Sequence, residues 1–156
     1  MKILVDADSC PKAARELTLR RAAKLSIRTI FAANRPIPCE EDSGSMEMEI
    51  CPAYENAADD RIVELAESGD IVITRDVPLA KRLVEKDVEV LDDRGRIFTV
   101  NNINELLSMR NFIVGLADSG LEIERIANYG KKELKSFADS LDRILTRRIS
   151  THAAPR

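Results

Sequence analysis

Short apolar runs rich in β-branched residues alternate with amphipathic helical segments along the whole chain. Strands that join through helices make right-handed crossovers, and these place the strands parallel in one sheet with helices on both faces. The pattern therefore predicts an α/β fold, a three-layer α/β/α Rossmann-like domain with a mostly parallel central sheet. The strands are predicted at 3–5, 27–33, 46–51, 70–74, 88–91 and, as a hairpin arm, 97–99. The helices are predicted at 12–24, 57–67, 78–85, 103–117 and 132–148.

The length and composition favour one folded unit. We expect a single domain over residues 1–148 and a flexible C-terminal tail over 149–156. The hydrophobic fraction of 44% and the charged fraction of 33% are typical of a globular protein and argue against extensive disorder. No apolar run reaches the length of a membrane span, and the run after Lys2 is too short for a signal peptide. We therefore expect a soluble cytoplasmic protein with no membrane partner.

The residue types available for chemistry are restricted. Cys10, Cys39 and Cys51 are too widely spaced to indicate a disulfide framework or a zinc site, and we expect three free thiols. The single histidine, His152, falls in the predicted tail and is assigned no role. Any mechanism must therefore use carboxylates. The net charge of −3 does not indicate a nucleic-acid-binding protein, although local basic patches can outweigh the sum.

Two carboxylates follow the first predicted strand. Asp6 and Asp8 come after it, and Pro11 then begins a helix. Open α/β sheets bind ligands at the carboxyl ends of their strands. Residues two apart in an extended chain point the same way, and a divalent cation would relieve the repulsion between two such charges. Alternatively, Asp8 or Ser9 only caps the helix, and Asp6 is an ordinary residue at a strand end in solvent.

The expected strand order adds more carboxylates to this pair. The strands beginning at residues 3 and 71 should be neighbours at the point where the strand order reverses. This places Asp76 beside the first pair, and the start of the helix 57–67 brings Asp59, or in its place Asp60, to the same crevice. The alternative for Asp59 and Asp60 is stabilisation of a helix dipole, and for Asp76 it is helix capping. The candidate catalytic and metal-binding residues are Asp6, Asp8, Asp59 and Asp76.

Carboxylate oxygens favour Mg²⁺ or Mn²⁺, and Mg²⁺ leaves positions for water and phosphate oxygens. Asn34 ends the second strand and orients a water or phosphate, or else caps a turn. Thr74 is a polar candidate that also fits as a plain strand residue. The cationic candidates would neutralise phosphate charge, or else they are solvated surface. The candidate substrate-binding residues are Ser9, Lys12, Asn34, Thr74 and Arg75.

Several motifs together resemble a known family. They are Val5-Asp6-Ala7-Asp8-Ser9-Cys10-Pro11, Ala33-Asn34, Ala58-Asp59, Gly69-Asp70-Ile71-Val72-Ile73-Thr74, Asp76-Val77-Pro78-Leu79-Ala80, Arg94-Gly95 followed by Thr99, and Met109-Arg110-Asn111-Phe112 followed by Gly120. In this order they resemble the YaiI/YqxD family of uncharacterised bacterial proteins, over residues 2–148.

That resemblance implies a PIN-like domain, a type of metal-dependent ribonuclease with a three-layer α/β/α fold. The acidic residues of PIN-like domains lie at the ends of the first and fourth strands and on an intervening helix, which transfers to Asp6, Asp8, Asp59 and Asp76. The family has no assigned reaction. Relatives often carry an amide in place of Asp60, which puts a role for Asp60 in doubt.

Three functions remain open, and the chain's status as an enzyme is open with them. The first is a nuclease that uses Mg²⁺ or Mn²⁺ to hydrolyse phosphodiesters, with RNA as the expected partner. The scarcity of aromatic residues argues against it, because single strands usually stack on aromatic rings. The second is a non-catalytic nucleic-acid-binding or regulatory module. The third is a haloacid-dehalogenase-like phosphatase in which Asp6 attacks phosphorus and Asp8 is the acid, but the chain leaves no room for the usual flap after the strand.

Overall fold

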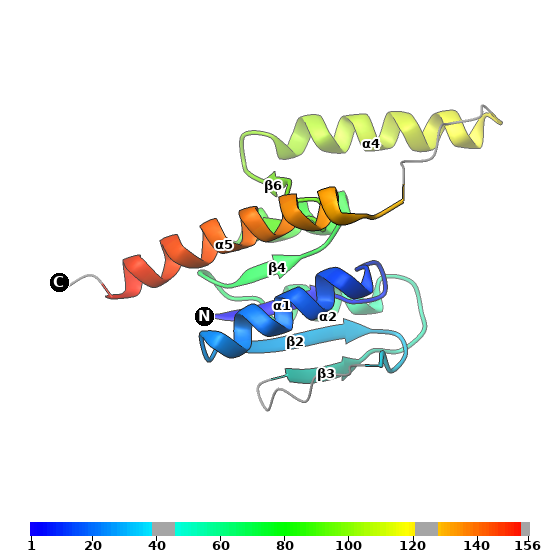
Figure 1. Cartoon of the computed structure of the whole chain (residues 1–156). Helices are drawn as coiled ribbons and strands as arrows, with labels where there is room; N and C mark the ends of the chain where they lie inside the picture. The colour runs from blue at the N-terminus through cyan, green and yellow to red at the C-terminus, as the bar shows by residue number, and fades with distance from the viewer. Residues whose placement is uncertain (39–45, 121–127, 154–156) are drawn as a thin grey trace.

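The computed structural model describes residues 1–38, 46–120 and 128–153 (Figure 1). Cys39, the loop expected over 40–45 and most of the irregular stretch expected over 120–130 lie outside these residues. The strands are β1 (Lys2–Asp6), β2 (Arg28–Ala33), β3 (Met46–Ile50), β4 (Ile71–Ile73), β5 (Glu89–Leu91) and β6 (Ile97–Phe98). The helices are α1 (Lys12–Lys24), α2 (Ala57–Leu65), α3 (Val77–Val84), α4 (Ile103–Asp118) and α5 (Lys131–Ala153).

The described strands form one sheet in the order β3-β2-β1-β4-β5-β6. Every neighbouring pair is parallel except the hairpin of β5 and β6. The prediction that the first strand neighbours the strand at residue 71 is confirmed, since Ile3 pairs with Ile71 and Val5 with Ile73. Because β1 lies between β2 and β4, the order of the strands reverses there, and the carboxyl end of β1 is the natural place for a site.

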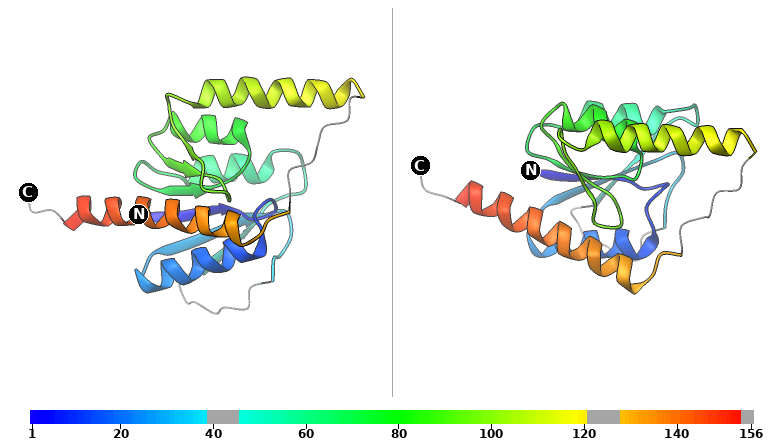
Figure 2. Two further views of the ribbon diagram at one scale, coloured as in Figure 1. Left: turned by 45° about the horizontal axis from the view of Figure 1, so that its top comes forward. Right: turned by 90° about the horizontal axis from the view of Figure 1, so that it is seen from above.

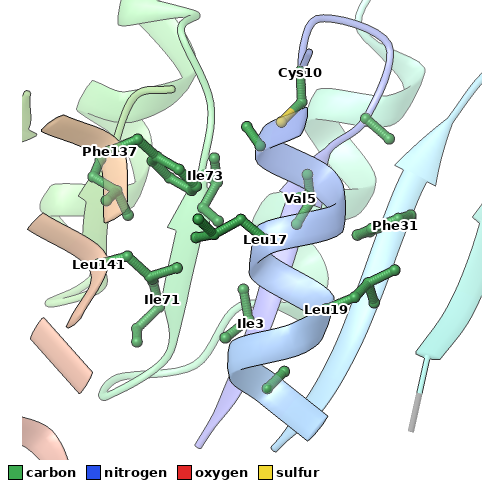
Figure 3. Close-up of a cluster of buried hydrophobic side chains, with 14 of the residues drawn as sticks. Ile3, Val5, Cys10, Leu17, Leu19, Phe31, Ile71, Ile73, Phe137 and Leu141 are labelled. Carbon is green, nitrogen blue, oxygen red and sulfur yellow. The ribbon is translucent and has the colours of Figure 1, made fainter. Parts of the chain in front are cut away.

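Alternate residues of the central strands serve two separate cores, because successive side chains point to opposite faces of a sheet. Ile3 and Val5 belong to the core under α1 and α5, whereas Leu4 packs with the core under α2 and α3. Figure 3 shows the first core, where Leu17 of α1 and Phe137 and Leu141 of α5 surround the strand residues. Helices therefore cover both faces (Figure 2), and the predicted three-layer α/β/α fold is confirmed.

The last helix is longer than predicted. Its predicted apolar stripe is confirmed, because Phe137, Leu141 and Ile144 are all buried. The helix was expected to end at residue 148, but it continues to Ala153. No proline or glycine interrupts residues 149–153, so nothing in the local sequence stops helical hydrogen bonding there. Residues 149–153 of the predicted flexible tail thus belong to α5, and residues 154–156 lie outside the described residues.

Helix α4 is attached mainly by its first turn. Ile103 is its buried residue, whereas Met109, Phe112 and Ile113 are 55%, 67% and 46% exposed. In Figure 1 its far end extends beyond the rest of the molecule. Within the described residues, no helix has the length and apolar character needed to cross a membrane.

Candidate functional site

Asp6 ends β1 and is the most enclosed of the candidate carboxylates. It shares the parity of Leu4, so its side chain points to the face covered by α2 and α3. It is 7% exposed, and its Oδ2 accepts hydrogen bonds from Thr74 Oγ1 at 2.9 Å and Ser9 Oγ at 3.1 Å. Burial raises the pKa of Asp6, the two hydroxyl groups oppose that rise, and the charges of Asp76 and Asp8 add to it.

Asp8 is positioned at the site by a turn and a backbone contact that the strand pattern did not predict. β1 ends at Asp6 and the chain turns at once, with the Cys10 amide donating to the Ala7 carbonyl at 3.4 Å, so the extended-chain argument for Asp6 and Asp8 is wrong. The exposed Asp8 instead accepts a hydrogen bond on Oδ2 from the backbone N–H of Asn34 at 2.9 Å. Helix α1 has Pro11 at its N-cap with no side-chain cap, so the alternative that Asp8 or Ser9 caps it is also wrong.

Neighbouring aspartates on α2 have different surroundings. Asp59 is partly buried, and burial, followed by the charges of Asp76 and Asp6, raises its pKa to about 6. A carboxylate that only stabilised a helix dipole would instead favour the charged form. Asp60 is exposed and accepts a hydrogen bond from Arg82 at 2.9 Å, outside the group formed by Asp59, Asp6 and Asp76. The structure therefore distinguishes Asp59 as the residue of this pair that faces the other carboxylates.

Asp76 caps a helix and also faces the site. Its Oδ1 accepts a hydrogen bond from the backbone N–H of Leu79 at 3.0 Å, so the capping role considered for it is confirmed. Its own backbone N–H donates to Thr74 Oγ1 at 3.1 Å. Thr74 thus connects Asp76 to Asp6, and the capping role does not remove Asp76 from the site.

These side chains line one cleft of about 280 Å³ at the carboxyl edge of the sheet. Its lining consists of Asp6, Asp8, Asn34, Asp59, Asp76 and residues 53–58. Among the described residues, no three histidine, cysteine, aspartate or glutamate side chains form a group that could enclose a metal ion. The cleft thus concentrates negative charge without a complete coordination shell. A larger hollow of about 410 Å³ lies between the C-terminal part of α1 and α5, and none of these carboxylates lines it.

The candidate substrate-binding residues occupy different places. Asn34 lines the cleft. Ser9 and Thr74 each donate a hydrogen bond to the Asp6 carboxylate, and the Thr74 side chain is buried, with only 2% of the residue exposed. Lys12 forms an ion pair with Glu16, and Arg75 pairs with Asp93, and neither cation lines the cleft.

The connector between β3 and α2 supplies a rim that the sequence pattern missed. Tyr54 lines the cleft and is 63% exposed, and Asn56 has a left-handed φ of +64° at the start of α2. An asparagine before a helix is a recognisable signal for such a turn, because asparagine tolerates that conformation better than most residues. The local sequence does not indicate that the connector borders the carboxylates, because the position of the connector depends on the packing of α2 on β1 and β2.

Because the pKa of Asp59 is raised, this residue should make the free energy of unfolding depend on pH. The pKa of Asp59 is raised from its ordinary value of 3.8 to about 6 in the folded state, so the stability that the protonated side chain contributes is lost as pH rises through this window. In EDTA we expect Asp59→Asn to unfold at a higher urea concentration than wild type at pH 7.5, by about 1–2 kcal/mol after allowance for solvent screening. At pH 4 this difference should vanish.

Asp60→Asn is the matched control, because Asp60 lies one residue away in solvent and pairs with Arg82. We expect its unfolding free energy to stay within about 0.5 kcal/mol of wild type at both pH values. An Asp59→Asn effect of equal size at pH 4 and pH 7.5 would contradict the electrostatic explanation.

Comparison with known proteins finds bacterial relatives over almost the whole length of this chain. The model of the family described as uncharacterized BCR, YaiI/YqxD family, matches residues 4–147. A UPF0178 protein of Treponema denticola is 46% identical over 149 residues, covering 96% of this chain and 94% of the relative. UPF0178 proteins of Treponema pallidum and Pseudomonas paraeruginosa are 44% and 42% identical, covering 92% and 94% of this chain and 80% and 91% of those relatives. No solved structure matches the chain.

Proposed function

This chain belongs to the YaiI/YqxD family, and from the carboxylate cleft we propose that it is a metal-dependent nuclease that hydrolyses phosphodiesters, with RNA as its substrate. The observation that supports this proposal best is the grouping of aspartates from separate elements at the carboxyl edge of the sheet. Asp6 ends β1, Asp59 lies on α2 and Asp76 caps α3. The charge of Asp76 raises the pKa of both Asp6 and Asp59, and the charge of Asp6 also raises the pKa of Asp59. Such a group is costly unless a cation or protons compensate it.

The donor set suits a hard divalent ion such as Mg²⁺ or Mn²⁺. Because no three carboxylates form a closed group among the described residues, we propose that one or two of Asp6, Asp8, Asp59 and Asp76 bind the ion directly. Mg²⁺ commonly binds in this way and keeps its other positions for water and phosphate oxygens. When bound, the ion would supply positive charge for the phosphate and activate a water molecule.

The residues of the chain have distinct parts in this proposal. Ser9 and Thr74 fix the orientation of the Asp6 carboxylate, and the Asn34 backbone N–H does the same for Asp8. Asp59 and Asp76 add to the negative charge of the cleft, and the side chain of Asn34, which also lines the cleft, would contact a phosphate oxygen. These fixed positions allow the cleft to bind its cation with little rearrangement.

The direct test is hydrolysis of labelled single-stranded RNA and DNA by the wild-type protein with Mg²⁺, with Mn²⁺ and with EDTA. We expect cleavage of RNA with at least one of the two ions and none in EDTA. Absence of cleavage with every ion and substrate would overturn the proposal and favour a non-catalytic binding module. A phosphate mimic trapped covalently on Asp6 would instead favour phosphatase chemistry.

A further inference from the structure

A second hollow adjoins the carboxylate cleft and has the opposite charge. Its volume is about 320 Å³, and it shares Asp8 with the cleft. Arg15 of α1 and Arg35, which follows β2, line it together with residues 36–38. We call this hollow the arginine groove. The two hollows meet at Asp8, so a ligand that crosses this boundary passes from carboxylates to guanidinium groups.

Both arginines are presented by constrained chain segments. Arg15 donates from Nη1 to the Cys10 carbonyl at 2.6 Å, which ties its guanidinium to the turn after β1. Arg35 follows Asn34, whose backbone binds Asp8, and Pro36 and Pro38 restrict the chain that follows. Guanidinium groups remain charged at every relevant pH and match phosphate oxygens with paired donors.

The other cations of this edge are already engaged. Arg75 pairs with Asp93, and Lys12 pairs with Glu16. Neither of these residues lines the cleft or the arginine groove. Arg15 and Arg35 are therefore the cations that line the hollow adjoining the cleft at Asp8, and the sequence pattern did not single them out.

We propose that the arginine groove binds a backbone phosphate of a nucleic-acid strand while the neighbouring phosphate lies over the carboxylates. This inference rests on the proposed function, because it extends the same substrate beyond the cleft. A strand repeats its phosphates at every nucleotide, so a phosphate held at the cation brings the next one to an adjoining site. Local guanidinium groups also explain how a chain with a net charge of −3 binds a polyanion.

The test measures binding in the whole chain carrying Asp6→Asn, a substitution that we expect to stop the proposed hydrolysis. Fluorescence anisotropy of a labelled single-stranded oligouridylate is recorded in Mg²⁺ at several salt concentrations. We expect Arg15→Gln and Arg35→Gln each to weaken binding about threefold to tenfold and to reduce the salt slope by about 0.7, the value for one phosphate contact. In the Asp6-intact protein, the same changes should raise KM more than they lower kcat.

Arg28→Gln is the matched control, because Arg28 begins β2 at the opposite edge of the sheet and pairs there with Glu47. It should leave both the affinity and the salt slope unchanged. Unchanged binding after loss of Arg15 and Arg35, or no oligouridylate binding at all, would overturn the proposal. Inorganic phosphate that bound as tightly as the oligomer would also overturn it, since the groove would then be a small-anion site.

The outcomes separate this inference from the proposed function. If the wild-type protein cleaves RNA but the arginine variants bind and cleave normally, the groove proposal fails and the nuclease proposal stands. If binding depends on Arg15 and Arg35 while no metal ion supports cleavage, the groove proposal stands and the nuclease proposal fails.

Discussion

Asp6→Asn should reduce metal-dependent RNA hydrolysis about a thousandfold or more. The substitution keeps the shape of the side chain and the acceptor for Thr74 and Ser9, but it removes a charge from the centre of the cleft. The electrostatic stabilisation lost at such a position is worth several kcal/mol in the transition state. The measurement is the initial rate of oligonucleotide cleavage at saturating Mn²⁺, with circular dichroism and urea unfolding to show that the fold is retained.

Asp59→Asn should reduce the same rate by about a hundredfold or more, whereas Asp60→Asn should leave it within about twofold. The two residues are consecutive on α2, but only Asp59 lines the cleft, and Asp60 pairs with Arg82 in solvent. This comparison has a second readout, because Asp59→Asn is expected to lose activity while it gains stability at pH 7.5. Equal activity of the Asp59 and Asp60 variants would exclude the cleft as the site of hydrolysis.

Gly95→Ala should destabilise the fold by about 2–4 kcal/mol, which is a large effect for a substitution that only replaces a hydrogen atom with a methyl group. Gly95 lies in the turn between β5 and β6 with a φ of +88°, where a Cβ atom is strained. That Cβ would also lie 2.4 Å from the carbonyl oxygen of Ser136 on α5, and backbone cannot move aside cheaply. Ser140 donates to the Gly95 carbonyl at 2.7 Å, so the contact fixes α5 against the hairpin.

Gly115→Ala is the control for this change. Gly115 lies inside α4 and an added Cβ meets nothing within 4 Å, so alanine should stabilise the helix by up to about 1 kcal/mol. Urea unfolding at pH 7 measures both variants. A Gly95→Ala protein as stable as wild type would show that the hairpin and α5 do not pack as described.

Much of the architecture could be predicted because local patterns carry it. The β-branched run at Ile71–Ile73 and the apolar stripe of Phe137 and Leu141 each predict their element without knowledge of the rest of the chain. General rules on crossovers predict that the strands at residues 3 and 71 are neighbours, as they are in the sheet, and this neighbourhood places Asp76 near Asp6. Periodicity and topology rules can thus predict which strands end at the same edge of the sheet.

The surroundings of each polar group could not be predicted in the same way. Thr74 and Arg75 are adjacent in the chain, yet Thr74 is buried against Asp6 while Arg75 turns away to Asp93. Asp8 binds the backbone of Asn34, which is 26 residues away. Such partners are chosen by where other elements lie in space, and no pattern of neighbouring residues encodes that choice.

By itself, the sequence determined the α/β class, the approximate extent of the elements and the set of acidic residues at strand ends, because these depend on side-chain periodicity and short-range backbone preferences. Only the tertiary structure decided that Asp59 rather than Asp60 faces the cleft, that Thr74 supports Asp6 and that Arg15 and Arg35 border Asp8. The physical reason is that burial and electrostatic interaction depend on distance through space, which a folded chain sets only when its layers pack together.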